Sequence, residues 1–191
     1  MPFLETATPT VAASALPTTL NAAHVLPEFT YRLEKANDAF AIDHIHRRAF
    51  GPGRYAKTAF RLRGSTQPDP RLCFVAELDG QTVATVRLTP ITVGADPVML
   101  LGPLAVHPDL KNRGAGRALL RLSLRAASDV GQKAVLLVGD QAYYCPFGFE
   151  PVPPGRITLP GPVDASRLLL APLNGASIAD FSGPARAVKT K

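Results

Sequence analysis

The sequence lacks tryptophan, has only two cysteines and contains no long apolar run. The longest unbroken apolar stretch, from Pro97 to Val106, has ten residues, whereas a membrane-spanning helix needs about 20. Cys73 and Cys145 are too few for a disulfide framework or for a zinc site with four cysteine ligands. The sequence therefore excludes a transmembrane helix, a disulfide-stapled fold and a cysteine-based metal site, and we expect no bound metal.

Acidic residues are fewer than basic ones, 15 against 21, which gives a net charge of +6 at pH 7. This charge suits an anionic ligand, but it suits solubility equally well. Residues 1–28 carry two charges, Glu5 and Glu28, and show neither helical nor strand periodicity, so we expect a flexible N-terminal arm. The same stretch lacks the basic start and apolar core of a secretory signal, so we expect a cytoplasmic protein with reduced thiols.

A length of 191 residues suits a single domain. Periodicity, capping residues and turn residues predict the elements of its first half. These are an edge strand at 29–33, a helix from Ala39 to Phe50 capped by Asp38 and stopped by Gly51, a short helix at 55–62, and strands at 72–78 and 82–88 joined by Asp79-Gly80.

The second half contains a predicted β-α-β unit. Its parts are a strand at 98–106 that opens at Gly102-Pro103, an amphipathic helix at 115–130 closed by Gly131, and a buried parallel strand at 133–140. A helical turn at 142–147 and strands at 156–159 and 168–170 follow.

The segment from Leu104 to Leu120 predicts an anion site, because a strand runs through a loop into Gly114 and Gly116 at the head of the long helix. Free N–H groups of a first helical turn bind phosphate, and Lys111, Arg113 and Arg117 add positive charge. A glycine turn with solvated basic residues is the simpler alternative. A dinucleotide-binding (Rossmann-like) fold is another, although Leu119 stands at its third glycine position.

Two motifs of the sequence carry a resemblance: Lys111-Asn-Arg-Gly-Ala-Gly116 and Asp140-Gln-Ala-Tyr-Tyr-Cys-Pro-Phe-Gly-Phe149. The first is similar to the Gln/Arg-x-x-Gly-x-Gly/Ala loop of the GNAT N-acetyltransferase superfamily, and the second is similar to the Tyr-x-x-x-Gly-Phe ending of the same superfamily. The second motif is most like a bacterial branch of predicted acetyltransferases that reads Ala-Tyr-Tyr-x-Arg-Phe-Gly-Phe. The resemblance covers residues 29–173, which we take as the domain, with residues 174–191 as a C-terminal extension or tail.

This resemblance implies a mixed α/β fold, in which a mostly antiparallel sheet is splayed between two central parallel strands and has helices on both faces. It also implies acetyl-CoA as cosubstrate and an amine as acceptor. Backbone groups of Leu104, Ala105 and Val106 would bind the pantetheine arm, and a backbone N–H near Leu104 would polarise the thioester. The pyrophosphate would lie on Lys111, Asn112, Arg113, Gly114, Ala115, Gly116 and Arg117, and Tyr144 would be the general acid.

Other candidate residues have simpler explanations. Tyr144 is alternatively a core aromatic, although Tyr143 is the better candidate for packing, and we interpret Cys145 as an inert thiol. His44 and His46 face different ways on their helix, which argues against a shared metal, and we interpret His107 as structural. Glu77 and Asp140 are candidates for the general base by residue type alone, and a water chain is an equal alternative.

Six basic residues and no acid lie between Asp43 and Asp69: Arg47, Arg48, Arg54, Lys57, Arg61 and Arg63. They form either a solvated face or, as the resemblance places them, the border of the site for an anionic acceptor. Nucleic-acid binding is the non-enzymatic alternative, using the stripe of Arg117, Arg121 and Arg125, but aromatic residues are scarce and no binding motif occurs. We expect a monomer or a homodimer with small-molecule or peptide acceptors and no membrane partner.

Overall fold

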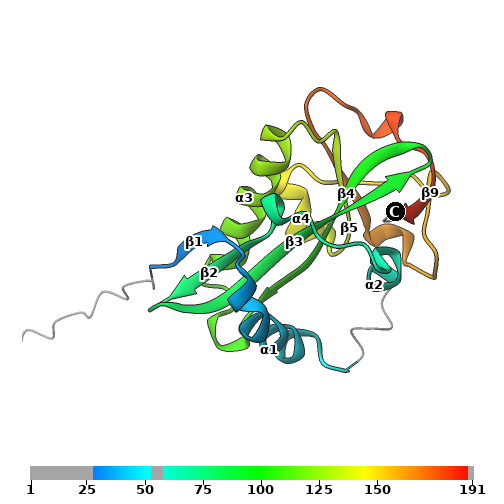
Figure 1. Ribbon diagram of the computed structural model, residues 1–191. Helices are drawn as coiled ribbons and strands as arrows, with labels where there is room; N and C mark the ends of the chain where they lie inside the picture. Colours follow the sequence, from blue (N-terminus) through cyan, green and yellow to red (C-terminus); the bar gives the residue numbers. More distant parts are fainter. Residues whose placement is uncertain (1–27, 53–57, 189–191) are drawn as a thin grey trace, which may run out of the picture.

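The computed structural model describes residues 28–52 and 58–188. In these residues, nine strands form one sheet in the order β1-β2-β3-β4-β5-β8-β6, and β9 pairs with β3 and β7 (Figure 1). The strands are β1 (Thr30–Leu33), β2 (Phe74–Leu78), β3 (Gln81–Val93), β4 (Asp96–Val106), β5 (Ala134–Val138), β6 (Glu150–Pro151), β7 (Ile157–Thr158), β8 (Leu168–Pro172) and β9 (Gly183–Ala187). The helices are α1 (Ala39–Phe50), α2 (Thr58–Arg63), α3 (Ala115–Asp129) and α4 (Gln141–Tyr144).

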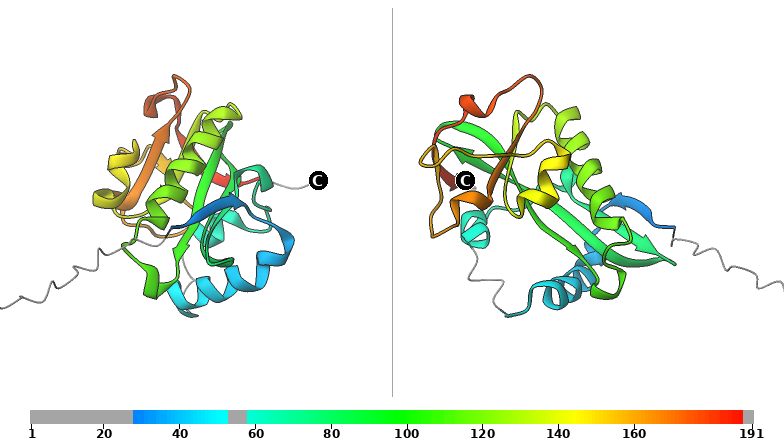
Figure 2. Two further views of the ribbon diagram at one scale, coloured as in Figure 1. Left: turned by 90° about the vertical axis from the view of Figure 1, so that its left-hand side faces the viewer. Right: turned by 180° about the vertical axis from the view of Figure 1, so that it is seen from behind.

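Helices cover both faces of the sheet, as predicted. Helix α3 packs on β2, β3 and β4 from one side, while α1 and α2 pack on the other (Figure 2). Each face has its own apolar cluster: Leu119 and Leu120 of α3 belong to the first, and Leu62 of α2 belongs to the second. The mixed α/β fold with a mostly antiparallel sheet is therefore confirmed.

The predicted hairpin is present, with differences at its ends. Asp79 and Gly80 both have positive φ, 51° and 75°, as a tight hairpin turn requires. Strand β2 begins at Phe74 rather than at the predicted residue 72, because residues 70–72 form a 3₁₀ turn capped by Asp69. Strand β3 continues past the predicted end at residue 88, and its last three residues pair with β9.

The two central strands, β4 and β5, separate along their length. They are parallel but pair at only two positions, Met99 with Val135 and Leu100 with Leu136. The β3–β4 register shifts between Val86 and Leu88, opposite the Gly102-Pro103 step. The strand opening predicted at this step is therefore confirmed, and it leaves β4 without a described partner on its β5 side from residue 101 onward.

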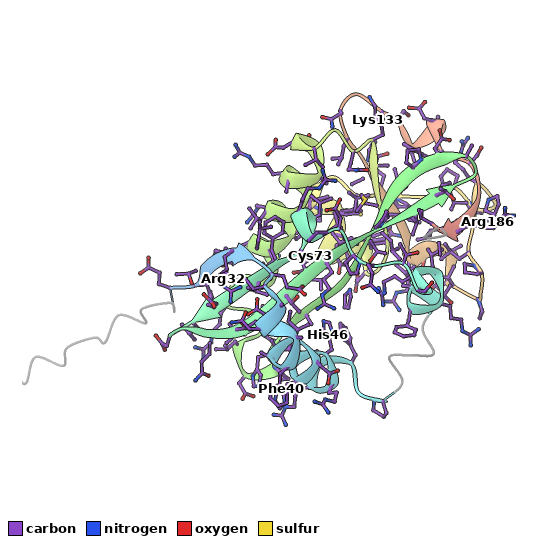
Figure 3. The ribbon with its side chains drawn as sticks, in the orientation of Figure 1. Arg32, Phe40, His46, Cys73, Lys133 and Arg186 are labelled. Carbon is purple, nitrogen blue, oxygen red and sulfur yellow. The ribbon has the colours of Figure 1, made fainter. Side chains whose placement is uncertain are left out.

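Asp38 stands at the N-cap position of α1, as predicted. Its side chain makes no capping bond to the helix; it accepts bonds from the Lys35 N–H at 2.7 Å and from Arg32, at 2.7 and 2.8 Å. Arg32, labelled in Figure 3, also pairs with Glu77 at 2.5 Å. The Arg32 hydrogen bonds lower the pKa of Asp38 to about 2. This cluster ties β1 and β2 to the start of α1, and Gly51 ends the helix as predicted.

The described part of the C-terminal segment packs onto the domain. Residues 183–187 form β9, which pairs with β3 and β7, and Phe181 and Ala185 belong to an apolar cluster of the sheet. The expected N-terminal arm lies outside the described residues except for Glu28, and the predicted short helix at 55–62 is described from Thr58. Among the described residues, none of the helices is long and apolar enough to cross a bilayer.

Candidate active site

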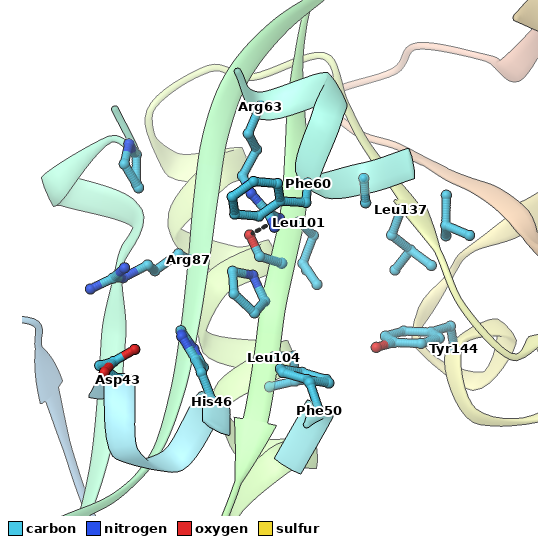
Figure 4. A pocket seen from close by; sticks show the side chains of 15 residues that line it. Asp43, His46, Phe50, Phe60, Arg63, Arg87, Leu101, Leu104, Leu137 and Tyr144 are labelled. Carbon is cyan, nitrogen blue, oxygen red and sulfur yellow. Dashed lines mark hydrogen bonds between the residues drawn. The ribbon is translucent and has the colours of Figure 1, made fainter. Parts of the chain in front are cut away.

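A cavity of about 310 Å³ opens where β4 and β5 separate (Figure 4). Its floor consists of β4 and β5 side chains, among them Leu101, Leu104 and Leu137. Helices α1 and α2 supply one wall, and Tyr144 of α4 supplies the opposite one. The cavity therefore joins the gap between the parallel strands to the sheet face that α1 and α2 cover.

Tyr144 is held at this cavity by its neighbours along the chain. Asp140 caps α4 by accepting a bond from the Ala142 N–H at 2.9 Å. The Tyr144 ring packs edge-on against Phe149, and it lies over Gly139 so closely that a Cβ there would come within 2.7 Å of its Cδ2 atom. Figure 4 shows its phenol oxygen pointing into the cavity toward β4. Burial, reinforced by Tyr143, raises the pKa of Tyr144 to about 12, so the phenol holds its proton at neutral pH.

Tyr143 faces a different part of the molecule. A Cβ on Gly116 would meet the Tyr143 phenol oxygen at 3.0 Å and Val106 at 3.2 Å, so the ring lies against the first turn of α3. Burial also raises its pKa, and Arg117 opposes this shift. Both tyrosines pack on the same apolar cluster, but Tyr144 is the one that lines the cavity.

The predicted anion loop has the expected geometry. Gly114 is the N-cap of α3 with φ of 96°, and the first helical bond runs from the Ala118 N–H to the Gly114 carbonyl at 3.0 Å. The N–H groups before residue 118 have no acceptor within the helix. Ala115 and Gly116 are buried, whereas the side chains at 111, 112, 113 and 117 are exposed around them. This helix start, extended by the unpaired edge of β4 at residues 104–106, suits a long ligand with a charged end.

The basic segment contributes one cavity residue among those described, Arg63. Arg47 pairs with Asp43 at 2.9 Å on the surface of α1, and Arg48 and Arg61 are exposed. Arg54 and Lys57 lie outside the described residues. Among the four described members of this basic set, Arg63 is therefore the one that lines the cavity.

Arg87 is a cavity residue that the sequence reasoning missed. It comes from β3, and Glu34 accepts two bonds from it, at 2.7 and 2.6 Å. Burial lowers the Arg87 pKa, but the Glu34 bond and charge outweigh this effect, so that its pKa is raised. The sequence feature that could have identified Arg87 is its position as a charged residue in the middle of an otherwise uncharged strand.

The two carboxylates suggested as bases do not line the cavity: Glu77 pairs with Arg32, and Asp140 caps α4. His46 lines the cavity, whereas His44 stacks near His107 elsewhere, so the two helix histidines do face different ways. Cys145 lies in the turn after α4 and is not among the lining residues. In residues 28–52 and 58–188, no three side chains of metal-ligating type are grouped to hold a metal ion.

The sheet is mostly antiparallel, which does not fit the doubly wound parallel sheet of the dinucleotide-binding alternative. A mostly antiparallel sheet that opens between two parallel strands, with a glycine-rich helix start and a buried tyrosine at the gap, is the architecture of the GNAT acetyltransferases. The sequence profile of the Acetyltransferase (GNAT) family matches residues 39–149, and the chain belongs to this family.

Proteins similar to this chain in sequence and in structure are N-acetyltransferases. The uncharacterized N-acetyltransferase YjhQ of Escherichia coli is 31% identical over 127 residues, which cover 64% of this chain and 70% of YjhQ. The N-acetyltransferase YhbS of the same species is 34% identical over 122 residues, 62% of this chain and 72% of its own. The crystal structure of YhbS with CoA superposes with a TM-score of 0.71 and 27% identity, covering 85% of this chain and 91% of YhbS. A Brucella melitensis GNAT acetyltransferase with acetyl-CoA shares the fold, with a TM-score of 0.63, 23% identity and coverage of 84% and 96%.

Proposed function

We propose that the protein transfers the acetyl group of acetyl-CoA to a primary amine by direct attack, with Tyr144 as general acid. The amine nitrogen forms a bond to the thioester carbonyl carbon, the carbon–sulfur bond breaks, and the Tyr144 phenol donates its proton to the sulfur. The attacking nitrogen loses one proton to water as the amide forms, and a proton from water restores the Tyr144 phenol. The observation that carries this proposal is the protonated Tyr144 phenol pointing into the gap between β4 and β5. A phenol that holds its proton is the form that a general acid needs, because the leaving thiolate must be protonated.

The chain offers fitting partners for each part of acetyl-CoA. The unpaired edge of β4 at Leu104, Ala105 and Val106 offers backbone groups to the amides of the pantetheine arm. The loop of residues 111–117 offers N–H groups and cations to the pyrophosphate. A backbone N–H near Leu104 is the group we expect to polarise the thioester carbonyl. The relative YhbS was crystallised with CoA, which supports CoA as a ligand of this chain.

The acceptor amine reaches the gap from the α1 and α2 side. Asp43 and His46 line that side and are of a type that can take the proton of an ammonium group, directly or through water. The proposal includes a cytoplasmic location, which suits the free thiols of Cys73 and Cys145, and a monomer or a homodimer as the working unit.

Ligand-induced stabilisation tests the cosubstrate. A ligand that binds only the folded state raises its melting temperature, so CoA and acetyl-CoA should raise the Tm in a concentration-dependent way. NAD and NADP are the controls and should leave the Tm unchanged. Stabilisation by NAD and none by CoA would overturn the proposal.

Replacing Tyr144 by Phe tests the general acid. The ring and its packing remain while the phenolic proton is lost, so kcat should fall by about 10² to 10⁴ with little change in CoA affinity. Tyr143→Phe is the matched control, because that ring lies against α3 outside the cavity lining. Thiol release from acetyl-CoA measures the rate, and equal, small effects of both variants would mean that neither tyrosine is the acid.

A further inference from the structure

The cavity contains a guanidinium group whose charge is not balanced by a described carboxylate. We propose that Arg63 binds a carboxylate of the acceptor, and that the enzyme therefore acetylates amines that carry a carboxylate close to the amino group. This inference rests on the acetyl transfer proposed above and names its acceptor class.

Arg63 is fixed in place by two described contacts. It is the last residue of α2, and one of its terminal nitrogens donates a bond to the Gly102 carbonyl at 3.0 Å. Its guanidinium carbon lies 5.6 Å from the centre of the Phe60 ring. Figure 4 shows the side chain reaching from α2 to the opened part of β4. One guanidinium nitrogen is thus hydrogen-bonded, and the guanidinium group keeps further N–H donors for a planar anion such as a carboxylate.

The charges around the cavity leave one positive charge uncompensated. Glu34 balances Arg87, and Arg47 balances Asp43. No ion pair joins Arg63 to a carboxylate among the described residues, and the neighbouring segment 53–57 contains no acidic residue. Burial, together with the charge of Arg87, lowers the pKa of Arg63, which means that its surroundings disfavour the cation. An anionic group in the cavity offsets that cost, because a partly buried charge gains most from a hydrogen-bonded partner.

The position of Arg63 sets the distance between carboxylate and amine. The Gly102 carbonyl that anchors it lies two residues from Leu104, or about 7 Å along a strand. A carboxylate on Arg63 therefore leaves an amine a few bonds away at the thioester, as in an amino acid. The cavity volume of about 310 Å³ lies at the low end for ligand sites and suits a molecule of that size.

The phosphates of CoA are a poor match for Arg63. Between Pro103 and Val106 the strand rises by about 10 Å, and the anion loop begins only beyond that point. The loop also leads into α3, which covers the opposite face of the sheet from α2. The Arg63 charge is thus left for the acceptor.

A matched acceptor series tests the inference in the unmodified protein. Phenylalanine, phenylalanine amide and phosphoethanolamine are compared by thiol release from acetyl-CoA. We expect kcat/KM for phenylalanine to exceed that for its amide at least tenfold, because a charge-assisted bond strengthens acceptor binding. The amide has the less basic amine, so without carboxylate recognition it should react faster. Preference for the amide would overturn the inference. Preference for phosphoethanolamine would overturn the carboxylate assignment and show that the site binds a phosphate group of the acceptor.

Variants at position 63 assign the preference to this side chain. Arg63→Gln should raise the KM for phenylalanine and collapse its advantage over the amide, and Arg63→Lys should restore part of it. Arg61→Gln on the same helix is the control, because Arg61 is exposed and does not line the cavity. An acid-to-amide ratio that is unchanged in Arg63→Gln would contradict the assignment, and the acceptor series decides the question if that variant fails to fold.

A binding measurement separates this inference from the proposed function. N-acetylphenylalanine should raise the Tm of the wild-type protein and of Arg61→Gln but not of Arg63→Gln. If CoA binds and no amine is acetylated, the proposed transfer fails while the carboxylate site is still tested by this shift. If acetyl transfer occurs but N-acetylphenylalanine stabilises wild type and Arg63→Gln equally, the carboxylate site alone is wrong.

Discussion

At the scale of single residues, the position of Tyr144 depends on a missing side chain. Gly139 directly follows β5, and the side on which it lacks a Cβ faces the Tyr144 ring and Leu137. A Cβ at this position would lie 2.7 Å from Tyr144 Cδ2 and 2.9 Å from Leu137 Cδ1, both shorter than normal contacts. Gly139 therefore acts as a positioning residue for the phenol.

We predict that Gly139→Ala lowers kcat by about 10²-fold, because a shift of about 1 Å in a reacting group has an effect of that size. The variant should also lose about 1 to 3 kcal/mol of folding free energy through overpacking. A double-mutant cycle identifies the cause: in the Tyr144→Phe background, Gly139→Ala should reduce kcat little further. Fully additive losses would show that Gly139 does not act through Tyr144.

At the scale of elements, the start of α3 depends on backbone conformation rather than on space. Gly114 has φ of 96°, where L residues are strained, yet no atom lies within 4 Å of a Cβ placed there. Its freedom is what lets the loop turn into the helix with its N–H groups directed outward. A side chain at Gly114 consequently changes the direction of the turn rather than filling a cavity.

We predict that Gly114→Ala costs about 1 to 3 kcal/mol of stability and weakens CoA binding. Gly155→Ala is a matched control, because Gly155 also has positive φ, 78°, and no neighbour within 4 Å, but lies between β6 and β7. Chemical denaturation and CoA titration of both variants check this expectation. If Gly155→Ala weakened CoA binding equally, general destabilisation rather than the turn at Gly114 would be the cause.

Elements with a strong local pattern were predictable from the sequence. Short stretches of sequence were enough to predict the hairpin turn at Asp79-Gly80, the apolar stripe of α3 and the opening at Gly102-Pro103. Tyr144 was found in a different way, through the resemblance of its motif to the GNAT superfamily. Strands β6 and β9, of two and five residues, have no such pattern and exist through their partners. Arg63 and Arg87 both line the cavity because of tertiary packing, and their spacing along the sequence could not predict this.

At the scale of the whole molecule, β9 connects β7 to the main sheet. Strand β9 pairs with Ile91, Thr92 and Val93 of β3 on one edge and with β7 on the other. Phe181, just before it, is 3% exposed and packs in the cluster that also contains Leu62 of α2. Because α2 carries Arg63, this segment supports the wall of the cavity from behind.

Removal of the segment should therefore affect both stability and the acceptor site. A chain ending at Leu173 loses β9 and Phe181, and burial of one such aromatic side chain contributes about 3 kcal/mol. We expect it to unfold at a clearly lower temperature or to aggregate, whereas a chain ending at Val188 should keep the wild-type Tm.

Phe181→Ala is the milder version and should cost about 3 to 5 kcal/mol in denaturant unfolding. In that variant the KM for the acceptor should rise more than the Kd for CoA, because the damage lies next to α2 and far from α3. A full-stability protein ending at Leu173 would show that the domain does not need β9.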